Sequence, residues 1–451
     1  MEKNLAERGE PYAKKNWNQI RFHLVIISIL NIFPRVKKIV VRIWDYIHLS
    51  QYQRRAIRLL IKNDNDFDID KLYWVNPKKI QYASLKEFDV FLYKGNIIGG
   101  NWDLLEKSFE DLDVYIAFKE RFVEGKKWET TMFYQRTLDE IKQGKFLWNC
   151  KNQSDFDIRL KKLELLFKTI KNNGYKSQQK LQSKNNSDPL KLEDEVAINI
   201  GRDGDLLFNN GAHRLSIAKL LSIPKIPMKI TVRHPQWVNL KKQILLYSND
   251  QPSGKIYQPL THIDLQDIPA FHETEIDRFE IIRKSLSVKK GRLLDIGANW
   301  GFFCHRFEEL GFDCIAVEND HVNVYFLEKL KRAENRKFTI IPQSIFDYKN
   351  IDTINFDVIL ALNIFHHFLK TEESYHKLIN LLKKLNVKEL YFEPHCPEEF
   401  YNIIVYKNYS EEEFVQFILD NTTLNHATFI GETQDGRKIF KLSQTEKRSS
   451  S

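Results

Sequence analysis

One stretch constrains the fold more than any other part of the chain: residues 292–303, which read Arg-Leu-Leu-Asp-Ile-Gly-Ala-Asn-Trp-Gly-Phe-Phe. The apolar run 293–296 has the length and composition of a buried parallel strand, and the amphipathic run 302–310 predicts a helix. Glycines at a strand-to-helix turn let the backbone take positive φ and come close to a ligand. Unpaired N–H groups at the helix N-terminus add polar contacts. The stretch therefore predicts a ligand-binding turn in an α/β fold.

An acidic residue, Glu318, follows the next apolar run, 314–317. An acid about 20 residues beyond a glycine-rich turn typically binds ribose hydroxyls. The turn itself reads Asp-x-Gly-x-x-x-Gly, so the close pair of glycines that accommodates a pyrophosphate is missing. The expected ligand carries a ribose without a pyrophosphate, which argues against NAD and FAD.

Five further apolar runs continue the alternation of strands and helices. Runs 338–341, 356–362 and 388–392 predict strands, and runs 428–432 and 437–442 flank Gln434-Asp435-Gly436, a hairpin signal. From 276 to 442 the pattern resembles the class I S-adenosylmethionine (SAM)-dependent methyltransferases, with the stretch at 292–303 in the position of their motif I. The resemblance implies SAM as cofactor and a Rossmann-like α/β domain at 276–444 with a seven-stranded sheet.

The resemblance also implies which residues bind SAM. They are Asp295, Gly297, Asn299 and Gly301 at the methionine end, Glu318 at the ribose, Asp347 at the adenine and Asn363 beside the methionine portion. The segment before the domain, 257–275, carries His262, Asp264, Asp267 and His272. It is interpreted either as a lid over the cofactor cleft or as a solvated connector.

The loop after the fourth predicted strand, where substrates of this family meet the cofactor, reads Asn-Ile-Phe-His-His. It lacks the Asn/Asp-Pro-Pro-Tyr/Phe motif of DNA adenine methyltransferases, and a Pro-Cys nucleophile for pyrimidine C5 is also missing. We therefore expect O- or N-methylation of a small molecule, or of a glycan or lipid-linked head group. A histidine base is expected, since histidine titrates near neutrality. The candidate catalytic residues are His366, His367, His395 and Glu393, and no spacing of ligands predicts a metal.

A second α+β domain is predicted at 51–247. Its later part reads as strands at 196–200 and 206–208, a helix at 215–221 and a strand at 227–232. Gly211-Ala-His213-Arg214 resembles the Gly-x-His-Arg box of the ParB/sulfiredoxin-like superfamily. That resemblance implies that Gly211, His213 and Arg214 bind an anion or a nucleotide such as ATP or ADP. Ala212 replaces the reactive cysteine of sulfiredoxin, and a turn-rich segment, 248–254, follows where partition proteins carry a helix-turn-helix.

Two other functions therefore compete with the first. The middle domain would be a nucleotide-dependent phosphotransferase, with Glu195, Asp203 or Asp205 as base, and the C-terminal domain would sense SAM. In the third interpretation the chain is a nucleic-acid methyltransferase with a basic surface. The formal charge is +9, but the 60 acidic residues are interspersed with the 69 basic ones, which is typical of a solvated surface and argues against nucleic acid.

The remaining segments are an arm at 1–50, a Lys-, Asn- and Ser-rich loop at 171–188, a linker at 248–275 and a disordered tail at 445–451. The arm contains an apolar run, 24–33, too short to span a bilayer, which takes about 20 residues. A basic amphipathic run, 35–49, follows it. The region 24–49 is interpreted either as a peripheral contact with anionic membrane lipid or as a segment that packs on the next domain. Four scattered cysteines without Cys-x-x-Cys, and no signal-peptide pattern, favour the cytoplasm.

Overall fold

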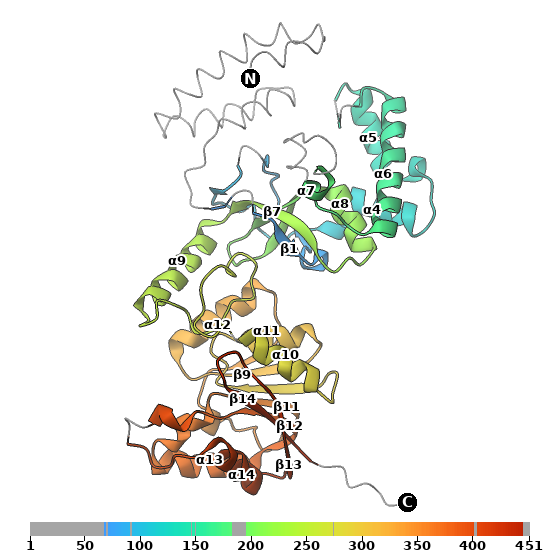
Figure 1. Ribbon diagram of the computed structural model, residues 1–451. Coiled ribbons are helices and arrows are strands. Elements are labelled where there is room, and N and C mark those ends of the chain that lie inside the picture. Colours follow the sequence, from blue (N-terminus) through green and yellow to red (C-terminus); the bar gives the residue numbers. More distant parts are fainter. Residues whose placement is uncertain are drawn as a thin grey trace, which may run out of the picture. The chain divides into compact units, whose positions relative to one another are not determined.

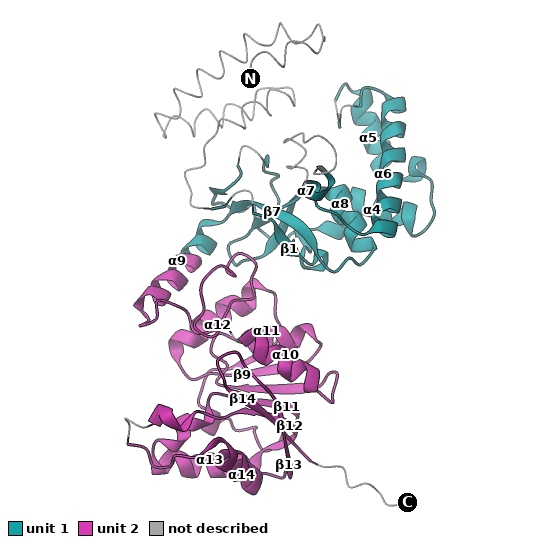
Figure 2. Ribbon diagram, in the orientation of Figure 1, with its two compact units in different colours: residues 1–239 teal, residues 240–451 magenta. Residues whose placement is uncertain are grey.

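The chain divides into two compact units, residues 1–239 and 240–451 (Figure 2). The computed structural model describes residues 67–68, 71–90, 93–145, 147–148, 150–182, 195–273, 275–400 and 404–444. The predicted arm at 1–50, with its membrane contact at 24–49, and the predicted tail at 445–451 lie outside the described residues.

The C-terminal unit is built on the predicted seven-stranded sheet, in the order β10-β9-β8-β11-β12-β14-β13. The first five strands in this order are parallel, and β14 runs antiparallel to both of its neighbours. The strands are β8 (Arg292–Ile296), β9 (Asp313–Val317), β10 (Thr339–Ile341), β11 (Asn355–Leu362), β12 (Asn386–Glu393), β13 (His426–Glu432) and β14 (Lys438–Ser443). All seven predicted runs are confirmed as strands, including the terminal hairpin.

Helices cover both faces of this sheet, which explains why its strands read as continuous apolar runs. Successive residues of a strand point to opposite faces, so Leu293 and Val358 belong to one core and Leu294 and Ile359 to the other. The helices are α10 (Glu275–Ser285), α11 (Phe302–Glu309), α12 (His321–Ala333), α13 (Glu372–Lys384) and α14 (Glu411–Asn421). Figure 1 shows α13 and α14 on one side of the sheet and α10 and α11 on the other.

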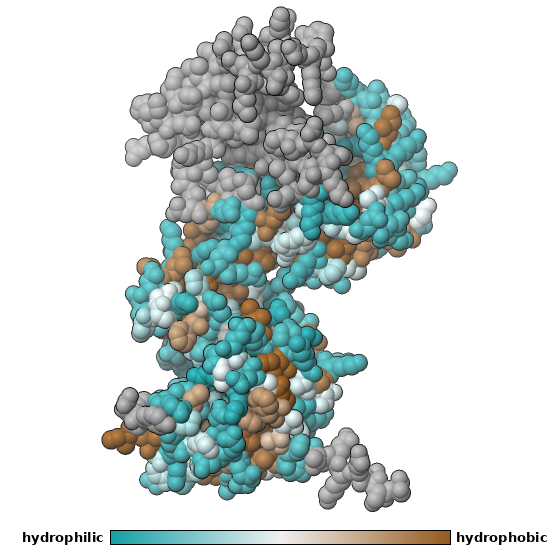
Figure 3. All heavy atoms as spheres, in the orientation of Figure 1, coloured by the Kyte–Doolittle hydropathy of each residue, from teal (hydrophilic) through white to brown (hydrophobic). Residues whose placement is uncertain are grey.

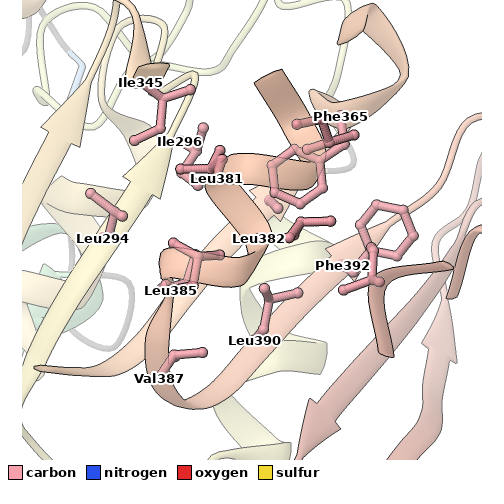
Figure 4. Close-up of a cluster of buried hydrophobic side chains, with 14 of the residues drawn as sticks. Leu294, Ile296, Ile345, Phe365, Leu381, Leu382, Leu385, Val387, Leu390 and Phe392 are labelled. Carbon is pink, nitrogen blue, oxygen red and sulfur yellow. The ribbon is translucent and has the colours of Figure 1, made fainter. Parts of the chain in front are cut away.

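The larger core lies between the sheet and α13 and α14. Leucine and phenylalanine side chains from β8, β12 and α13 meet there, among them Leu294, Leu382, Leu390 and Phe392 (Figure 4). Leu382 and Leu390 are fully buried. Because this core touches the strands whose carboxyl ends carry the candidate site, its packing holds those ends in register.

The N-terminal unit contains a second seven-stranded sheet, in the order β1-β7-β5-β6-β2-β4, with β3 beside β7. The strands are β1 (Tyr73–Val75), β2 (Tyr82–Ala83), β3 (Asn96–Ile97), β4 (Lys107–Ser108), β5 (Val196–Ile200), β6 (Leu206–Asn210) and β7 (Ile226–Arg233). The helices are α4 (Asp113–Phe122), α5 (Met132–Lys142), α6 (Gln153–Asn173), α7 (Gln178–Gln182) and α8 (Ala212–Leu220). The predicted strand, strand, helix and strand of residues 196–232 are confirmed. The superfamily resemblance of this unit stays a prediction.

Three predicted boundaries differ from the structure. Helix α8 begins at Ala212 rather than at 215, because Gly211 takes φ +90° and caps it. The predicted loop at 171–188 is wrong for residues 171–173, where α6 continues to Asn173, and for residues 178–182, which form α7, whereas residues 174–177 connect the two helices. Helix α9 (Pro235–Asp250) crosses both the division after Asn239 and the predicted domain end at 247.

The segment 251–273 is not a solvated connector. Leu265 and Ile268 are buried, and the Lys241 ammonium donates to the carbonyl of Asp264 at 2.7 Å. Exposed large hydrophobic side chains elsewhere are scattered between hydrophilic ones, as Figure 3 shows for one face. Among the described residues, no helix combines the length and apolar character needed to cross a membrane.

Because β12 lies in the larger core, truncating one of its buried side chains is expected to lower the free energy of unfolding strongly. Leu390→Ala removes a fully buried side chain and is expected to lower the free energy of unfolding by about 2–5 kcal/mol, measured by urea denaturation of the full chain. The matched control Val322→Ala, on α12 and 47% exposed, is expected to cost less than about 0.5 kcal/mol. Equal costs for the two variants would contradict the packing described here.

Candidate active site

The glycine turn after β8 has the conformation that the sequence predicts. Gly297 and Gly301 have φ +76° and +84°, and Asn299 also takes positive φ, +52°. The amides of Gly297 and Ala298 donate to the carbonyl of Val317 at 2.9 and 3.0 Å, which ties the turn to the end of β9. A Cβ on Gly297 would lie 2.8 Å from Cδ1 of Ile364. The positive φ therefore favours glycine at this position, and a Cβ there would also make the Ile364 side chain shift.

The carboxylate of Glu318 faces this turn. Its Oε2 accepts from the backbone N–H of Asn299 at 2.8 Å, and its Oε1 accepts from the N–H groups of Asn319 and Asp320, both at 2.9 Å. Because a carboxylate has about four acceptor positions, Oε2 keeps capacity for a further donor. The structure thus brings the predicted ribose acid and the predicted glycine turn together.

Two observations test whether these residues fit SAM. The side-chain Oδ1 of Asn299 is buried and has no hydrogen-bond partner, so it is an acceptor that a ligand could satisfy. Gly297 brings bare backbone to the carboxyl end of β8, where a ligand of an open α/β sheet binds. Both observations fit the predicted SAM site, in which Glu318 would hold the ribose and the turn would line the methionine end.

The other predicted cofactor residues differ in exposure. Asp295 is buried beneath the turn beside the Cys304 thiol at 3.8 Å, and burial raises its pKa to about 7. Asp347, at the end of a 3-10 helix (Ile345–Asp347), is exposed. Asn363 takes φ +52°, donates to the Tyr257 hydroxyl at 3.0 Å and accepts from Arg437 Nη1 at 3.0 Å.

Tyr257 and Arg437 were missed at the sequence level. They lie far from Asn363 in the chain, and neither belongs to a motif, so only the fold reveals them. The segment that carries Tyr257 also brings His272, whose ring lies 4.5 Å from the Tyr257 ring, edge to face. Of the other polar residues predicted there, His262 and Asp264 are buried.

Glu393 does not have the surroundings of a catalytic base. Its Oε2 and Oε1 accept from Nε and Nη2 of Arg278 at 2.5 and 2.9 Å, and Nη1 of Arg437 lies 3.8 Å from Oε1. The side chains of Arg278 and Glu393 are 2% and 0% exposed. A fully buried carboxylate between two guanidinium groups is a counter-ion, which corrects its predicted catalytic role.

The three candidate histidines gather beyond the ends of β11 and β12. The His366 ring lies 4.0 Å from the His367 ring and 5.6 Å from the His395 ring. Burial, with neighbouring positive groups, lowers the pKa of His366 to about 2, and burial with the nearby Lys370 lowers the pKa of His367. Both rings are therefore neutral at pH 7, and His366 is a weak base.

His395 is the histidine best arranged to accept a proton. The Asn408 amide donates to the carbonyl of Pro397 at 3.3 Å, so its Oδ1 is an acceptor and lies 3.0 Å from Nε2 of His395. This contact assigns the ring proton to Nε2. Nδ1 of His395 is then unprotonated, and it is buried without a hydrogen-bond partner.

The predicted anion site of the N-terminal unit has a different character. The His213 ring packs among Trp148, Phe118 and Phe133, at 5.2, 5.6 and 6.0 Å, and burial lowers its pKa to about 3. Arg214 Nη1 lies 4.0 Å from Oε2 of Glu195.

The structure brings Gly211, His213 and Arg214 together at the N-terminus of α8. The His213 ring, however, lies in an aromatic cluster, and the Arg214 guanidinium lies near the Glu195 carboxylate. An incoming anion would meet the charge of Glu195, so this geometry does not favour ATP, ADP or another anion at these residues. Within the described ranges, no group of three His, Cys, Asp or Glu residues is arranged to hold a metal ion.

Comparison with known proteins identifies the C-terminal unit. Residues 294–385 match the family described as "Methyltransferase domain", so this unit contains a methyltransferase domain. No curated protein matches the sequence significantly.

Several solved structures resemble parts of the chain at low identity. The bifunctional kinase-methyltransferase WbdD is 18% identical over 44% of this chain and 46% of its own, with a TM-score of 0.35, so the chain spans less than half of WbdD. A SAM-dependent methyltransferase from Archaeoglobus fulgidus is 17% identical over 38% of this chain and 95% of its own, with a TM-score of 0.31. The methyltransferase domain of bacterial CtHen1 is 13% identical over 38% and 98%, with a TM-score of 0.30.

The buried pair of Arg278 and Glu393 predicts a non-additive effect on stability. Arg278→Ala leaves the Glu393 charge buried beside a single, more distant arginine and is expected to lower the free energy of unfolding by about 3–5 kcal/mol. The double variant Arg278→Met with Glu393→Leu removes both charges and is expected to be more stable than Arg278→Ala, as measured by chemical denaturation. A double variant less stable than the single one would contradict this role of the pair.

Proposed function

We propose that this chain is a SAM-dependent methyltransferase that methylates an oxygen or nitrogen of a small-molecule acceptor, or of a glycan or lipid-linked head group. The observation that carries the proposal is the contact between the Glu318 carboxylate and the Asn299 amide of the glycine turn, inside a methyltransferase domain. That contact supports a ribose-bearing ligand, because acid and turn face the same ligand position.

In this proposal the chain supplies binding and orientation. Glu318 Oε2 accepts from a ribose hydroxyl, Asn299 Oδ1 accepts from the ligand, and the Gly297 backbone allows close approach. SAM supplies an activated methyl group on a sulfonium, and the acceptor atom must be aligned with it for an in-line displacement.

We further propose that His395 is the general base. Its Nδ1 takes the proton from an acceptor hydroxyl as the bond to the methyl group forms and the bond from methyl to sulfur breaks. From an acceptor ammonium the proton must leave before that step, so that the nitrogen has a lone pair for the displacement. The hydrogen bond from Nε2 to Asn408 Oδ1 orients the ring and stabilises the imidazolium that results. The His366 and His367 rings then complete the acceptor side of the site rather than accept the proton.

The phosphotransferase alternative finds no support in the N-terminal unit, where His213 packs in the aromatic cluster. The class of acceptor is proposed from sequence motifs, and a nucleic-acid acceptor remains an outcome of the test below. A cytoplasmic location and a peripheral membrane contact through 24–49 are also proposals from sequence alone.

A first prediction tests the cofactor site. Glu318→Ala removes a carboxylate that would bind the ribose, and it should weaken SAM binding about tenfold or more in calorimetry, since hydrogen bonds to charged groups contribute about 1.5–3 kcal/mol. The control Glu328→Ala lies exposed on α12 and should leave the affinity unchanged. An unchanged SAM affinity in Glu318→Ala would exclude the site assignment.

A second prediction tests the base. With methyl-labelled SAM, sugars, lipid head groups, small amines and RNA are offered as acceptors, and label transfer identifies the class. His395→Ala should then slow transfer about 10²–10⁴-fold without weakening SAM binding, and Asn408→Ala should cause a smaller loss. Label transfer to RNA alone would refute the proposed acceptor class, and full activity of His395→Ala would refute the base.

A further inference from the structure

Glu275, the first residue of α10, is a buried carboxyl group that none of the sites above uses. It is 4% exposed, and its Oε2 is buried without a hydrogen-bond partner. Its Oε1 lies 3.5 Å from Arg278 Nη1, but both hydrogen bonds of that arginine to Glu393 are shorter. A buried polar oxygen without a hydrogen-bond partner is costly, so Oε2 is an acceptor that a ligand donor could satisfy.

Several charged and titratable groups surround Glu275, and the N–H of Glu275 donates to the carbonyl of His272 at 3.2 Å. These groups are Arg278 on α10, Asp295 at the end of β8, Glu393 at the end of β12, Asp435 in the β13–β14 turn and the hydroxyl of Tyr257. Acidic groups outnumber basic ones in this set. Asp295 leads into the glycine turn, and Tyr257 hydrogen-bonds Asn363. Glu275 thus interacts with Asp295, which leads into the glycine turn, in surroundings where Arg278 is outnumbered by acidic groups.

We propose that Glu275 binds the ammonium group of the methionine portion of SAM through its Oε2. An ammonium group would give the Oε2 oxygen the N–H donor that it lacks. It would also add a positive charge to a group in which Glu275, Asp295, Glu393 and Asp435 outnumber Arg278. The inference rests on the proposed SAM binding and adds the residue that would recognise the amino-acid end of the cofactor.

Binding of the cofactor would then be coupled to the release of a proton from Glu275. Burial raises the pKa of Glu275 to about 8, with Asp295, Glu393 and Asp435 adding to the shift and Arg278 opposing it. Glu275 is then mostly protonated at pH 7 without ligand. An ammonium ligand favours the carboxylate, lowers this pKa and releases the proton. SAM affinity should therefore rise from pH 6 towards pH 8, until the amino group of SAM, with an ordinary pKa of about 8, loses its own proton.

The experiment compares three ligands on the full chain by calorimetry. SAM and S-adenosylhomocysteine both carry the ammonium group, whereas 5′-methylthioadenosine lacks the whole amino-acid end. Glu275→Gln should weaken SAM and S-adenosylhomocysteine about ten- to a hundredfold and leave 5′-methylthioadenosine within about twofold. The rise of SAM affinity below pH 8 should also disappear in this variant.

The control is Glu280→Gln, on the same helix but in a surface ion pair with Arg283 at 2.6 Å, which should behave as the unmodified chain for all three ligands. Retained binding of 5′-methylthioadenosine shows that the pocket of Glu275→Gln is intact. If that variant does not fold, Glu275→Asp is used instead, because its shorter side chain moves the carboxylate away from the ligand. It should give the same selective loss of affinity for SAM and S-adenosylhomocysteine.

Each other outcome overturns the proposal. Equal losses for all three ligands would assign Glu275 a purely structural role, and a loss for SAM alone would place its charge against the sulfonium. No loss at all would leave SAM binding in place and remove only this inference. Failure of the unmodified chain to bind any of the three would remove the proposed function as well.

Discussion

The C-terminal unit depends on how acidic side chains are accommodated at the carboxyl ends of parallel strands. A buried carboxylate must be hydrogen-bonded, paired or protonated, and the three strand ends differ in which of these applies. Glu318 accepts three backbone N–H groups, Glu393 pairs with Arg278, and burial raises the pKa of Asp295 to about 7. The edge of the sheet therefore holds three acidic side chains in fixed positions, each stabilised in a different way.

The strands and the turn could be predicted because their causes are local. Strands buried on both faces read as apolar runs, and the positive φ of Gly297 and Gly301 leaves a recognisable spacing. Glu318 was predictable for the same reason, since a fixed number of residues separates it from the turn. The methyltransferase domain that contains these features is confirmed by its family match.

The partners of the site residues were not predictable, because they are set by contacts between distant parts of the chain. The sequence alone could not show that Glu393 is held by Arg278, or that Asn363 lies between Tyr257 and Arg437. Likewise, the aromatic rings around His213 come from α4, α5 and the segment after them. A motif therefore identified which residues lie at the N-terminus of α8, but not which way each side chain faces.

The position of β14 has a consequence for the order in which the unit can assemble. This strand is inserted between β12 and β13, and the hairpin that delivers it also carries Arg437 and Asp435. On a ribosome, residues 292–393 emerge well before the strand that completes their sheet. Until the hairpin docks, β12 presents an unpaired edge, which invites association with other chains. Asn363 and Glu393 therefore gain their contacts with Arg437 only after nearly all of the described chain has been synthesised.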